Sequence, residues 1–378
     1  MKPVAAETPV PLLDLGLAHR ELEEELKRDF ERVLRSGQFI LGAEHDAFER
    51  ELAAACGVPH AVGLSSGTSA ITIALQALDV GPGHEVIVPA FTYFASASAV
   101  TAAGATPVFA DVEPARLGLD PASTESKIGP ATRAILPVHL YGLACDLEPL
   151  VALGRRRNVP VIEDAAQAIG ATDRGHAVGT ETAGATLSFF PTKNLGALGD
   201  AGAFLTTQAD LATRIRLFRA QGDAGNYQHT VLGQNARLDA LQAAFLRTKL
   251  RHLGRWIEMR RETAARYREA LKGAPVTPPP EPPGAKHTYH QFTIRVPERD
   301  RLQAHLRERG IATRVYYPIP LHLQPCFASL GYRKGDFPVS ERLAGEVLSL
   351  PMFPGITEEQ VERVAAAVRE FYGGGAGV

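Results

Sequence analysis

The sequence predicts an α/β fold in which a largely parallel sheet packs against helices. Three observations predict it. Short, β-branched apolar runs bounded by glycine or proline recur along the chain, and segments with helical spacing separate them. A proline-dense stretch at residues 275–284 then divides the chain. The seven expected strands are residues 61–65, 85–90, 106–111, 134–140, 159–164, 185–190 and 202–207.

Helical spacing is clearest in five segments of the first three quarters of the chain. Two amphipathic helices are expected before the first strand, and two more helices between the strands. A long helix is expected to follow the last of these strands and to end before the proline-dense stretch. These helices are residues 19–34, 43–56, 71–78 and 146–157, and the long helix runs from about Arg237 to Lys272.

The proline-dense stretch predicts a boundary between a large domain, residues 1–274, and a small C-terminal α/β domain, residues 275–378. Within the small domain, residues 287–296 are expected to form a strand and residues 300–310 a helix. A terminal helix is expected after Thr357, whose hydroxyl suits the N-cap position.

Charge and cysteine usage exclude several classes of protein. The 378 residues carry 40 basic and 42 acidic side chains, a formal net charge of -2, which attracts neither nucleic acid nor an anionic membrane. The three cysteines, Cys56, Cys145 and Cys326, are far apart and form no CxxC pair. This spacing argues against a disulfide framework and a structural zinc, and it favours a reducing compartment. We expect a cytoplasmic protein.

One uncharged segment, residues 86–110, is long enough to cross a bilayer as a helix. Pro89, Gly104 and Pro107 interrupt it, however, and its middle is rich in Ser, Thr and Ala. It is therefore expected to form a strand, a short helix and a second strand inside a protein core. The N-terminus lacks the apolar region of a signal peptide.

The segment SSGTSA, residues 65–70, follows an apolar strand and opens a helix. A glycine turn at the start of a helix presents free backbone N–H groups at the positive end of the helix dipole, which suits a phosphate. Ser and Thr are also ordinary N-caps, so this segment alone leaves both interpretations open. The spacing is not that of a Walker loop, and no GxGxxG follows a strand.

Two carboxylates, Glu163 and Asp164, end the most hydrophobic strand. Buried carboxylates are costly unless each meets a cation or a hydrogen-bond donor. Ligands of open α/β sheets bind beyond the carboxyl ends of the strands, so Asp164 is placed to meet a ligand. It could equally serve as a helix N-cap, or hold a proton on a heterocyclic nitrogen.

The segment SFFPTKNLGALGDAG, residues 188–202, places Lys193 after a strand and before several glycines. The lysine could be a surface cation, a phosphate clamp or the covalent anchor of a cofactor. Desolvation at the end of a buried strand lowers a lysine pKa from about 10.4 and makes the amine a nucleophile toward a carbonyl.

The three features together predict a pyridoxal 5′-phosphate site. This cofactor needs a phosphate cradle, an acidic partner for its pyridinium nitrogen and an amine that forms a Schiff base with it. The helix start at residues 65–70, Asp164 and Lys193 provide these groups in that order along the chain. Tyr93 follows another strand and offers an aromatic face to the ring, although it could also be a core aromatic residue.

Nine motifs along the chain resemble the DegT/DnrJ/EryC1/StrS family of sugar aminotransferases, which belongs to fold type I of the pyridoxal phosphate enzymes. The resemblance covers nearly the whole chain and implies a mixed, mainly parallel seven-stranded sheet in the large domain. The motifs are PLLDL, SGQFILG, SSGTSA, PAFTYFASA, EDAAQAIGA, SFFPTKNLGALGDAGA, GQNARLDALQAA, YYPIPLHLQP and VLSLPMFP.

The resemblance implies a role for each matching residue. Lys193 would anchor the cofactor and Asp164 would pair with the ring nitrogen. Gln167 would contact the cofactor face or its 3-hydroxyl, and Tyr93 would stack on the ring. The phosphate would be held by Gly67, Thr68 and Ser188.

Members of the family form homodimers with shared active sites. The resemblance therefore implies that Asn235, in the GxNxR motif, touches the phosphate of the neighbouring subunit. Tyr317 and His322 match positions near the sugar pocket of relatives.

The family resemblance further implies transfer of an amino group from L-glutamate to a nucleotide-linked keto sugar. Lys193, in place of the histidine of a dehydrating branch, favours transamination. The motifs are most similar to those of 3-keto-sugar aminotransferases. A 4-keto-sugar aminotransferase, a pyridoxal phosphate lyase and a non-catalytic regulatory protein are the alternatives.

Overall fold

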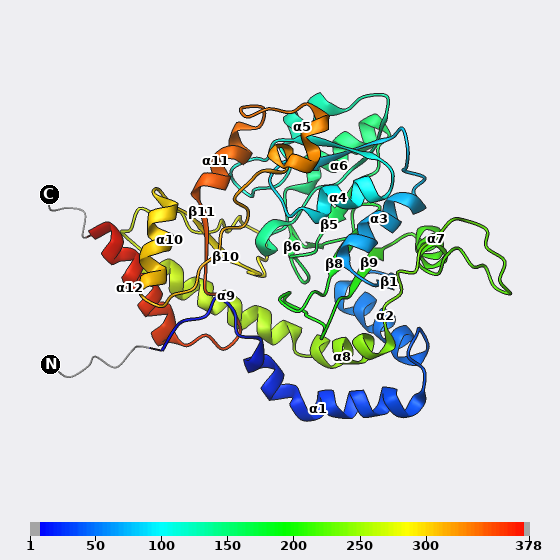
Figure 1. Ribbon diagram of the computed structural model, residues 1–378, viewed down its shortest axis with the longest axis horizontal. Coiled ribbons are helices and arrows are strands. Elements are labelled where there is room, and N and C mark those ends of the chain that lie inside the picture. Colours follow the sequence, from blue (N-terminus) through cyan, green and yellow to red (C-terminus); the bar gives the residue numbers. More distant parts are fainter. Residues whose placement is uncertain (1–7, 374–378) are drawn as a thin grey trace.

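Seven strands form two sheet units at the centre of the molecule (Figure 1). In this computed structural model, which describes residues 8–373, one unit has the order β1-β9-β8-β5 and the other has the order β3-β2-β4. Parallel bridges from Ile135 to Val161 and from Val138 to Asp164 connect the two units. The strands are β1 His60–Leu64, β2 Glu85–Pro89, β3 Thr106–Ala110, β4 Thr132–Ile135, β5 Ile162–Asp164, β8 Gly184–Ser188 and β9 Gly202–Thr206.

Only β9 runs against its neighbours. It pairs antiparallel with β1 and β8, whereas β2 with β3, β2 with β4, and β5 with β8 are parallel pairs. The expected mixed, mainly parallel arrangement is therefore found. Strands β4 and β5 are shorter than their sequence runs because Pro137 and Pro160 have no N–H to donate to a ladder.

Helices cover both faces of the sheet. Alternate residues of β9 point to opposite sides: Phe204 packs in one apolar cluster with α3 and α7, and Leu205 packs in another with α2 and α8. The helices are α1 Leu15–Ser36, α2 Ala43–Cys56, α3 Gly67–Ala77, α4 Ala95–Ala102, α5 Pro121–Lys127, α6 Leu147–Arg157, α7 Ala209–Arg219, α8 Ala240–Leu250, α9 Leu253–Ala270, α10 Arg299–Glu308, α11 Pro338–Glu346 and α12 Glu358–Gly373. Short 3-10 turns are η1 Leu140–Gly142, η2 Leu321–Leu323 and η3 Pro325–Leu330, and a small hairpin is formed by β6 Thr172–Asp173 and β7 His176–Ala177.

The uncharged segment at residues 86–110 forms the expected strand, helix and strand, namely β2, α4 and β3. Over the part of the chain that the structure describes, none of the helices has both the length and the apolar composition needed to cross a membrane.

The single long helix expected from Arg237 to Lys272 is two helices, and this expectation is wrong. Helix α8 ends at Leu250 and α9 begins at Leu253. Arg251 and His252 keep helix-like backbone angles, but the His252 amide bonds back to the Lys249 carbonyl, three residues earlier, as in a turn. No proline marks this break, and the helical spacing of apolar residues continues across it, so the sequence did not reveal it.

The C-terminal part has an apolar core of its own beside the sheet (Figure 1). Strands β10 Phe292–Arg295 and β11 Val347–Leu350 pair antiparallel, and helices α9, α10 and α12 pack with them. Val10 joins this core and pairs with Ile311. The Thr357 hydroxyl accepts from the Gln360 amide at 3.1 Å, so the expected N-cap of the terminal helix is confirmed.

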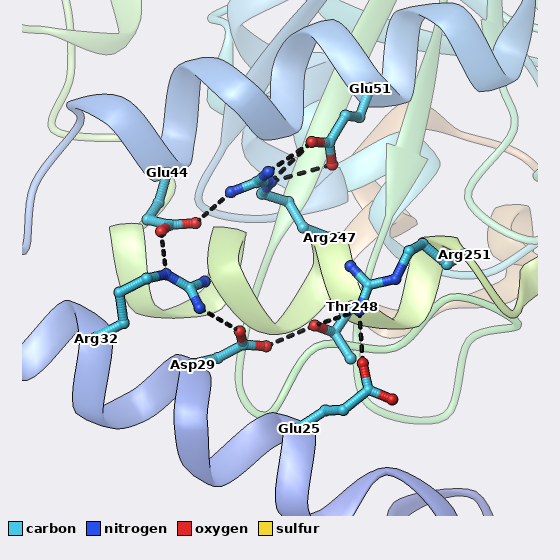
Figure 2. A network of polar contacts seen from close by, with 8 residues as sticks. All are labelled: Glu25, Asp29, Arg32, Glu44, Glu51, Arg247, Thr248 and Arg251. Atoms are coloured by element: carbon cyan, nitrogen blue, oxygen red, sulfur yellow. Dashed lines mark hydrogen bonds and ion pairs between the residues drawn. The ribbon is translucent and has the colours of Figure 1, made fainter.

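A network of charged side chains joins α1, α2 and α8 (Figure 2). Arg247 of α8 binds Glu51 through Nε and Glu44 through Nη1, at 3.0 and 2.6 Å. Arg32 of α1 binds the other oxygen of Glu44, at 2.6 Å. Because several charges share partners, the network holds α1 in place better than an isolated surface pair would.

Candidate active site

Two carboxylates end β5 and, as adjacent strand residues, point to opposite faces of the sheet. Glu163 is completely buried. It accepts hydrogen bonds from Nε2 of His139 at 2.8 Å, from the Gly179 amide at 3.0 Å and from the Thr182 hydroxyl. Its oxygens are therefore occupied by the protein.

Asp164 lies on the other face, where two donors from the described residues meet it. The Ser96 hydroxyl donates to Oδ2 at 2.7 Å, and the Ala166 amide donates to Oδ1 at 3.1 Å. Both donors are neutral, and the carboxylate is 4% exposed. The opposing charge on this face comes from Lys193, whose pKa the Asp164 carboxylate raises.

Lys193 lies on the loop after β8, which is tied down along its length. The Lys193 amide donates to the Phe190 carbonyl at 2.8 Å, and Asn194 Nδ2 donates to the Thr288 carbonyl at 2.9 Å. Farther along, Lys249 Nζ donates to the Gly196 carbonyl at 2.7 Å. The lysine is therefore displayed from a fixed backbone.

The Lys193 amine is more acidic than an ordinary lysine. Burial lowers its pKa to about 8, although the Asp164 carboxylate acts in the opposite direction. Near pH 7 about a tenth of the amine is therefore unprotonated, far more than for an ordinary lysine, and this is the form that attacks a carbonyl.

The start of α3 and the end of β8 meet as a small cradle. Ser66 caps α3, and a Cβ added to Gly67 would lie 2.8 Å from Cβ of Ser188. A Cβ on Gly202 would lie 2.3 Å from the carbonyl carbon of Ser66. Thr68 is exposed in the first turn of the helix. The structure therefore brings Gly67, Thr68 and Ser188 together at a helix N-terminus, where phosphate oxygens find N–H donors.

Aromatic side chains lie beside the carboxylate. Tyr93 is 55% exposed, and its ring centroid is 5.7 Å from that of Tyr317. The Tyr317 hydroxyl accepts from Gln167 Nε2 at 3.0 Å, and Gln167 Oε1 accepts from the Tyr141 amide at 2.7 Å. Asp164 is among the groups that raise the Tyr317 pKa, after burial, so Tyr317 belongs to the same site.

The remaining two predicted residues lie elsewhere. Asn235 is exposed and follows a loop that projects from the molecule beyond α7 (Figure 1). His322 is buried, with Nε2 3.1 Å from Glu341 and its ring against Phe337. The described contacts of His322 include neither Lys193 nor Asp164, and its role in binding a sugar stays a prediction, as does the role of Asn235.

Four residues in or beside the site were not predicted: Ser96, Tyr141, Lys249 and His290. Ser96 stands three residues after Tyr93 and Tyr141 directly follows the end of a β-strand run, so their positions carried a signal. Lys249 and His290 reach the Lys193 loop from α8 and from the segment before β10, and nothing in their local sequence indicates this approach.

Comparison with known proteins identifies the chain's relatives. The pattern of the DegT/DnrJ/EryC1/StrS aminotransferase family matches residues 20–369. The chain is 50% identical over 366 residues to the "Pleiotropic regulatory protein" of Geobacillus stearothermophilus, covering 96% of this chain and 98% of that protein. It is 46% identical over 368 residues to dTDP-3-amino-3,4,6-trideoxy-alpha-D-glucose transaminase of Streptomyces venezuelae, covering 97% of each.

Two solved structures share the fold. DesV of S. venezuelae, solved in complex with a ketimine intermediate, is 45% identical with a TM-score of 0.94, over 96% of this chain and 98% of that chain. NtdA of Bacillus subtilis, solved with bound cofactor PMP, is 33% identical with a TM-score of 0.88, over 98% of this chain and 86% of that chain. This chain belongs to the DegT/DnrJ/EryC1/StrS aminotransferase family.

Proposed function

We propose that the protein is a pyridoxal 5′-phosphate-dependent aminotransferase that moves an amino group from L-glutamate to a nucleotide-linked keto sugar. The observation that carries the proposal is the pair formed by Lys193 and Asp164. Lys193 is an amine with a lowered pKa, and Asp164 is a buried carboxylate whose hydrogen-bond donors among the described residues are neutral. PMP, the cofactor bound in NtdA, is the amine form of this cofactor.

The residues present fit the cofactor. The start of α3, with Gly67, Thr68 and Ser188, would hold its phosphate. Asp164 would meet the ring nitrogen, Gln167 would contact the ring face or the 3-hydroxyl, and Tyr93 would stack on the ring. When bound, the cofactor supplies an electron sink for the charge that develops on the donor's α-carbon.

Lys193 and Asp164 would divide the proton handling between them. The Lys193 amine would anchor the cofactor and would carry the proton to and from the donor's α-carbon. The Asp164 carboxylate keeps a proton on the ring nitrogen, because a buried negative charge favours the protonated pyridine. Ser96 and the Ala166 amide orient that carboxylate.

The amine acceptor is proposed to be a 3-keto-6-deoxy sugar carried on a nucleotide. The S. venezuelae relative is named for a 3-amino sugar, and two further relatives, 45% and 42% identical, are also named for 3-amino or 3-dehydro sugars. Tyr317 lies beside Tyr93 at the site and is a candidate for sugar contact, as is His322. One relative has a regulatory name, but the net charge of -2 gives this chain no overall attraction to nucleic acid.

A substrate panel tests the proposal. The purified protein, supplied with pyridoxal 5′-phosphate and L-glutamate, is incubated with UDP-, dTDP- and GDP-linked keto sugars, and products are identified by mass spectrometry and NMR. We expect an amino sugar together with 2-oxoglutarate. Amination at sugar carbon 4 would correct the regiochemistry, and absence of 2-oxoglutarate with every sugar would overturn the proposal.

We also propose a homodimer with shared active sites in the cytoplasm. The projecting loop before Asn235 exposes Tyr227 and Leu232 almost completely, as an arm that reaches a second copy would. Toward the C-terminal end of α1, Phe30 and Leu34 are each about half exposed. Light scattering of the purified protein gives the oligomeric state.

The boundary at residue 275 stays our proposed division into domains.

A further inference from the structure

A cavity of about 180 Å³ lies beside the Lys193 loop, between that loop, the segment just before β10 and strand β11. The N-terminal segment closes one of its sides: Leu12 and Leu13 line it, and the Leu12 carbonyl accepts from the Met352 amide at 3.2 Å. The polar side chains that line it are Thr192, His290, Gln291 and Tyr316, together with Ser349.

Two residues that line this cavity each carry a buried polar atom that has no hydrogen-bond partner within the described residues. These atoms are Nδ1 of His290, whose side chain belongs to a residue only 8% exposed, and Oε1 of Gln291. Leaving a buried polar atom unpaired costs about 1–3 kcal/mol, so such atoms in folded proteins commonly await a water or a ligand. Two adjacent residues with this property indicate a site for a polar group.

The charges around His290 favour an anion. Burial lowers the His290 pKa well below its usual range, and the positive charges of Lys193 and Arg260 lower it further. Arg260 Nη1 donates to the carbonyls of Tyr289 and Met352, at 3.1 Å each, and these neutral partners leave its charge in place. The two charges that act on this histidine are both positive, so they would attract a bound anion.

We propose that this cavity binds a carboxylate of the amino donor, with His290 and Gln291 as its polar contacts. The inference rests on the proposed aminotransferase function. The volume is below the range of about 300–1,000 Å³ typical of pockets for larger ligands, so it fits part of an amino acid better than a nucleotide sugar. Thr192 lines the cavity and is followed directly by Lys193, so a donor held there has its amine near the lysine.

The two half-reactions of an aminotransferase allow a direct test. L-Glutamate converts the loaded enzyme to its PMP form, and the amino sugar product does so in the reverse direction; only glutamate carries the carboxylate. Gln291→Glu keeps the side-chain volume and adds a negative charge to the cavity. We expect its half-saturating concentration for L-glutamate to rise roughly tenfold or more, as like charges repel at close range. The half-saturating concentration for the amino sugar should stay unchanged.

Binding without turnover gives a second readout. Calorimetric titration of the PMP form with 2-oxoglutarate should show weakened affinity in Gln291→Glu and in Gln291→Leu. Gln303→Glu, on α10 outside the cavity, is the matched control and should bind as the wild type does. Thermal melting establishes that each variant is folded, and His290→Asn tests the second contact.

The outcomes separate this inference from the function on which it rests. Gln291→Glu could leave the half-saturating concentration for L-glutamate unchanged, or raise that for the amino sugar equally. Either result would show that the carboxylate site is wrong, while the proposed aminotransferase function would remain. If the wild type reacts with the amino sugar but with no amino acid, the donor and its site are both wrong. If neither compound converts the cofactor, the proposed function fails as well.

Discussion

Two lysines, Lys193 and Lys249, and two buried carboxylates, Asp164 and Glu163, differ in what surrounds them. Lys193 and Asp164 face the candidate site, whereas Lys249 and Glu163 are hydrogen-bonded to other parts of the protein. Lys249 Nζ lies 2.7 Å from the Gly196 carbonyl and 3.0 Å from Nε2 of His19. Glu163 accepts from a histidine, an amide and a hydroxyl, and Asp164 accepts from two neutral groups among the residues that the structure describes.

The difference shows that a perturbed lysine is not by itself a catalytic lysine. Burial lowers the pKa of both Lys193 and Lys249 to about 8. Lys249 has its hydrogen bonds satisfied by the fold, so its amine holds a loop. Lys193 has a carboxylate close enough to affect its pKa on the face where a ligand is expected. A lysine whose hydrogen-bond partners are supplied by the fold therefore has a structural role here, whereas the lysine that faces a carboxylate on the ligand side is the candidate for catalysis.

Lys193→Ala is the change with the largest expected effect. Without the amine the cofactor has no covalent anchor and the proton no carrier, and we expect turnover to fall by about 10⁴-fold or more. Amino sugar formation over many turnovers is the measurement. Borohydride reduction of the loaded wild type should label Lys193. The same treatment of Lys249→Met should still label Lys193, and labelling at Lys249 in the wild type would contradict the comparison.

Asp164→Asn comes next. A neutral amide cannot hold the proton on the ring nitrogen, so we expect turnover to fall by about 10²–10³-fold while the cofactor remains bound. Glu163→Gln, one residue earlier, is the matched control. Since Glu163 points to the other face, its substitution should lower the melting temperature and leave kcat within a few-fold of wild type. Equal losses of kcat in both variants would mean that Glu163 affects the reaction as much as Asp164 does, although it lies on the other face of the sheet.

The acidity of Lys193 predicts a pH dependence. With a pKa of about 8, the ammonium form dominates at lower pH and cannot attack an aldehyde. The rate at which the apoenzyme captures pyridoxal 5′-phosphate should rise about tenfold per pH unit up to pH 8 and then level off. Stopped-flow absorbance measured from pH 6 to 9 checks this. A rate that still rises tenfold per unit at pH 9 would assign the amine an ordinary pKa.

The sequence predicted the layers of the fold and the centre of the site because both depend on local patterns. Apolar runs mark the seven strands, and Lys193 and Asp164 follow strand ends, where parallel strands bring ligand groups together. The break between α8 and α9 was missed because no proline or capping residue marks it. Helical spacing continues across Arg251 and His252, and only the hydrogen bonds differ.

The contacts that distinguish the two lysines could not be predicted, because they join distant segments. Lys249 reaches Gly196 across 53 positions, and Gln167 reaches Tyr317 across 150. Such contacts depend on packing in three dimensions. The same reason applies to His290, which lies close enough to Lys193 for that lysine to lower its pKa.

Lys249→Met has the smallest expected effect and tests the structural half of the comparison. It removes the donor to the Gly196 carbonyl, and an unpaired buried carbonyl costs about 1–3 kcal/mol. Because the folded-state pKa of Lys249 is about 8 instead of 10.5, folding favours its neutral form, and the wild type gains stability as pH rises through this interval. Methionine cannot titrate, so the loss of melting temperature in the variant should be larger at pH 9.5 than at pH 7. Asn194 still ties the Lys193 loop to Thr288, and kcat should fall far less than in Lys193→Ala. A variant as inactive as Lys193→Ala, with its fold intact, would show that Lys249 acts in the reaction.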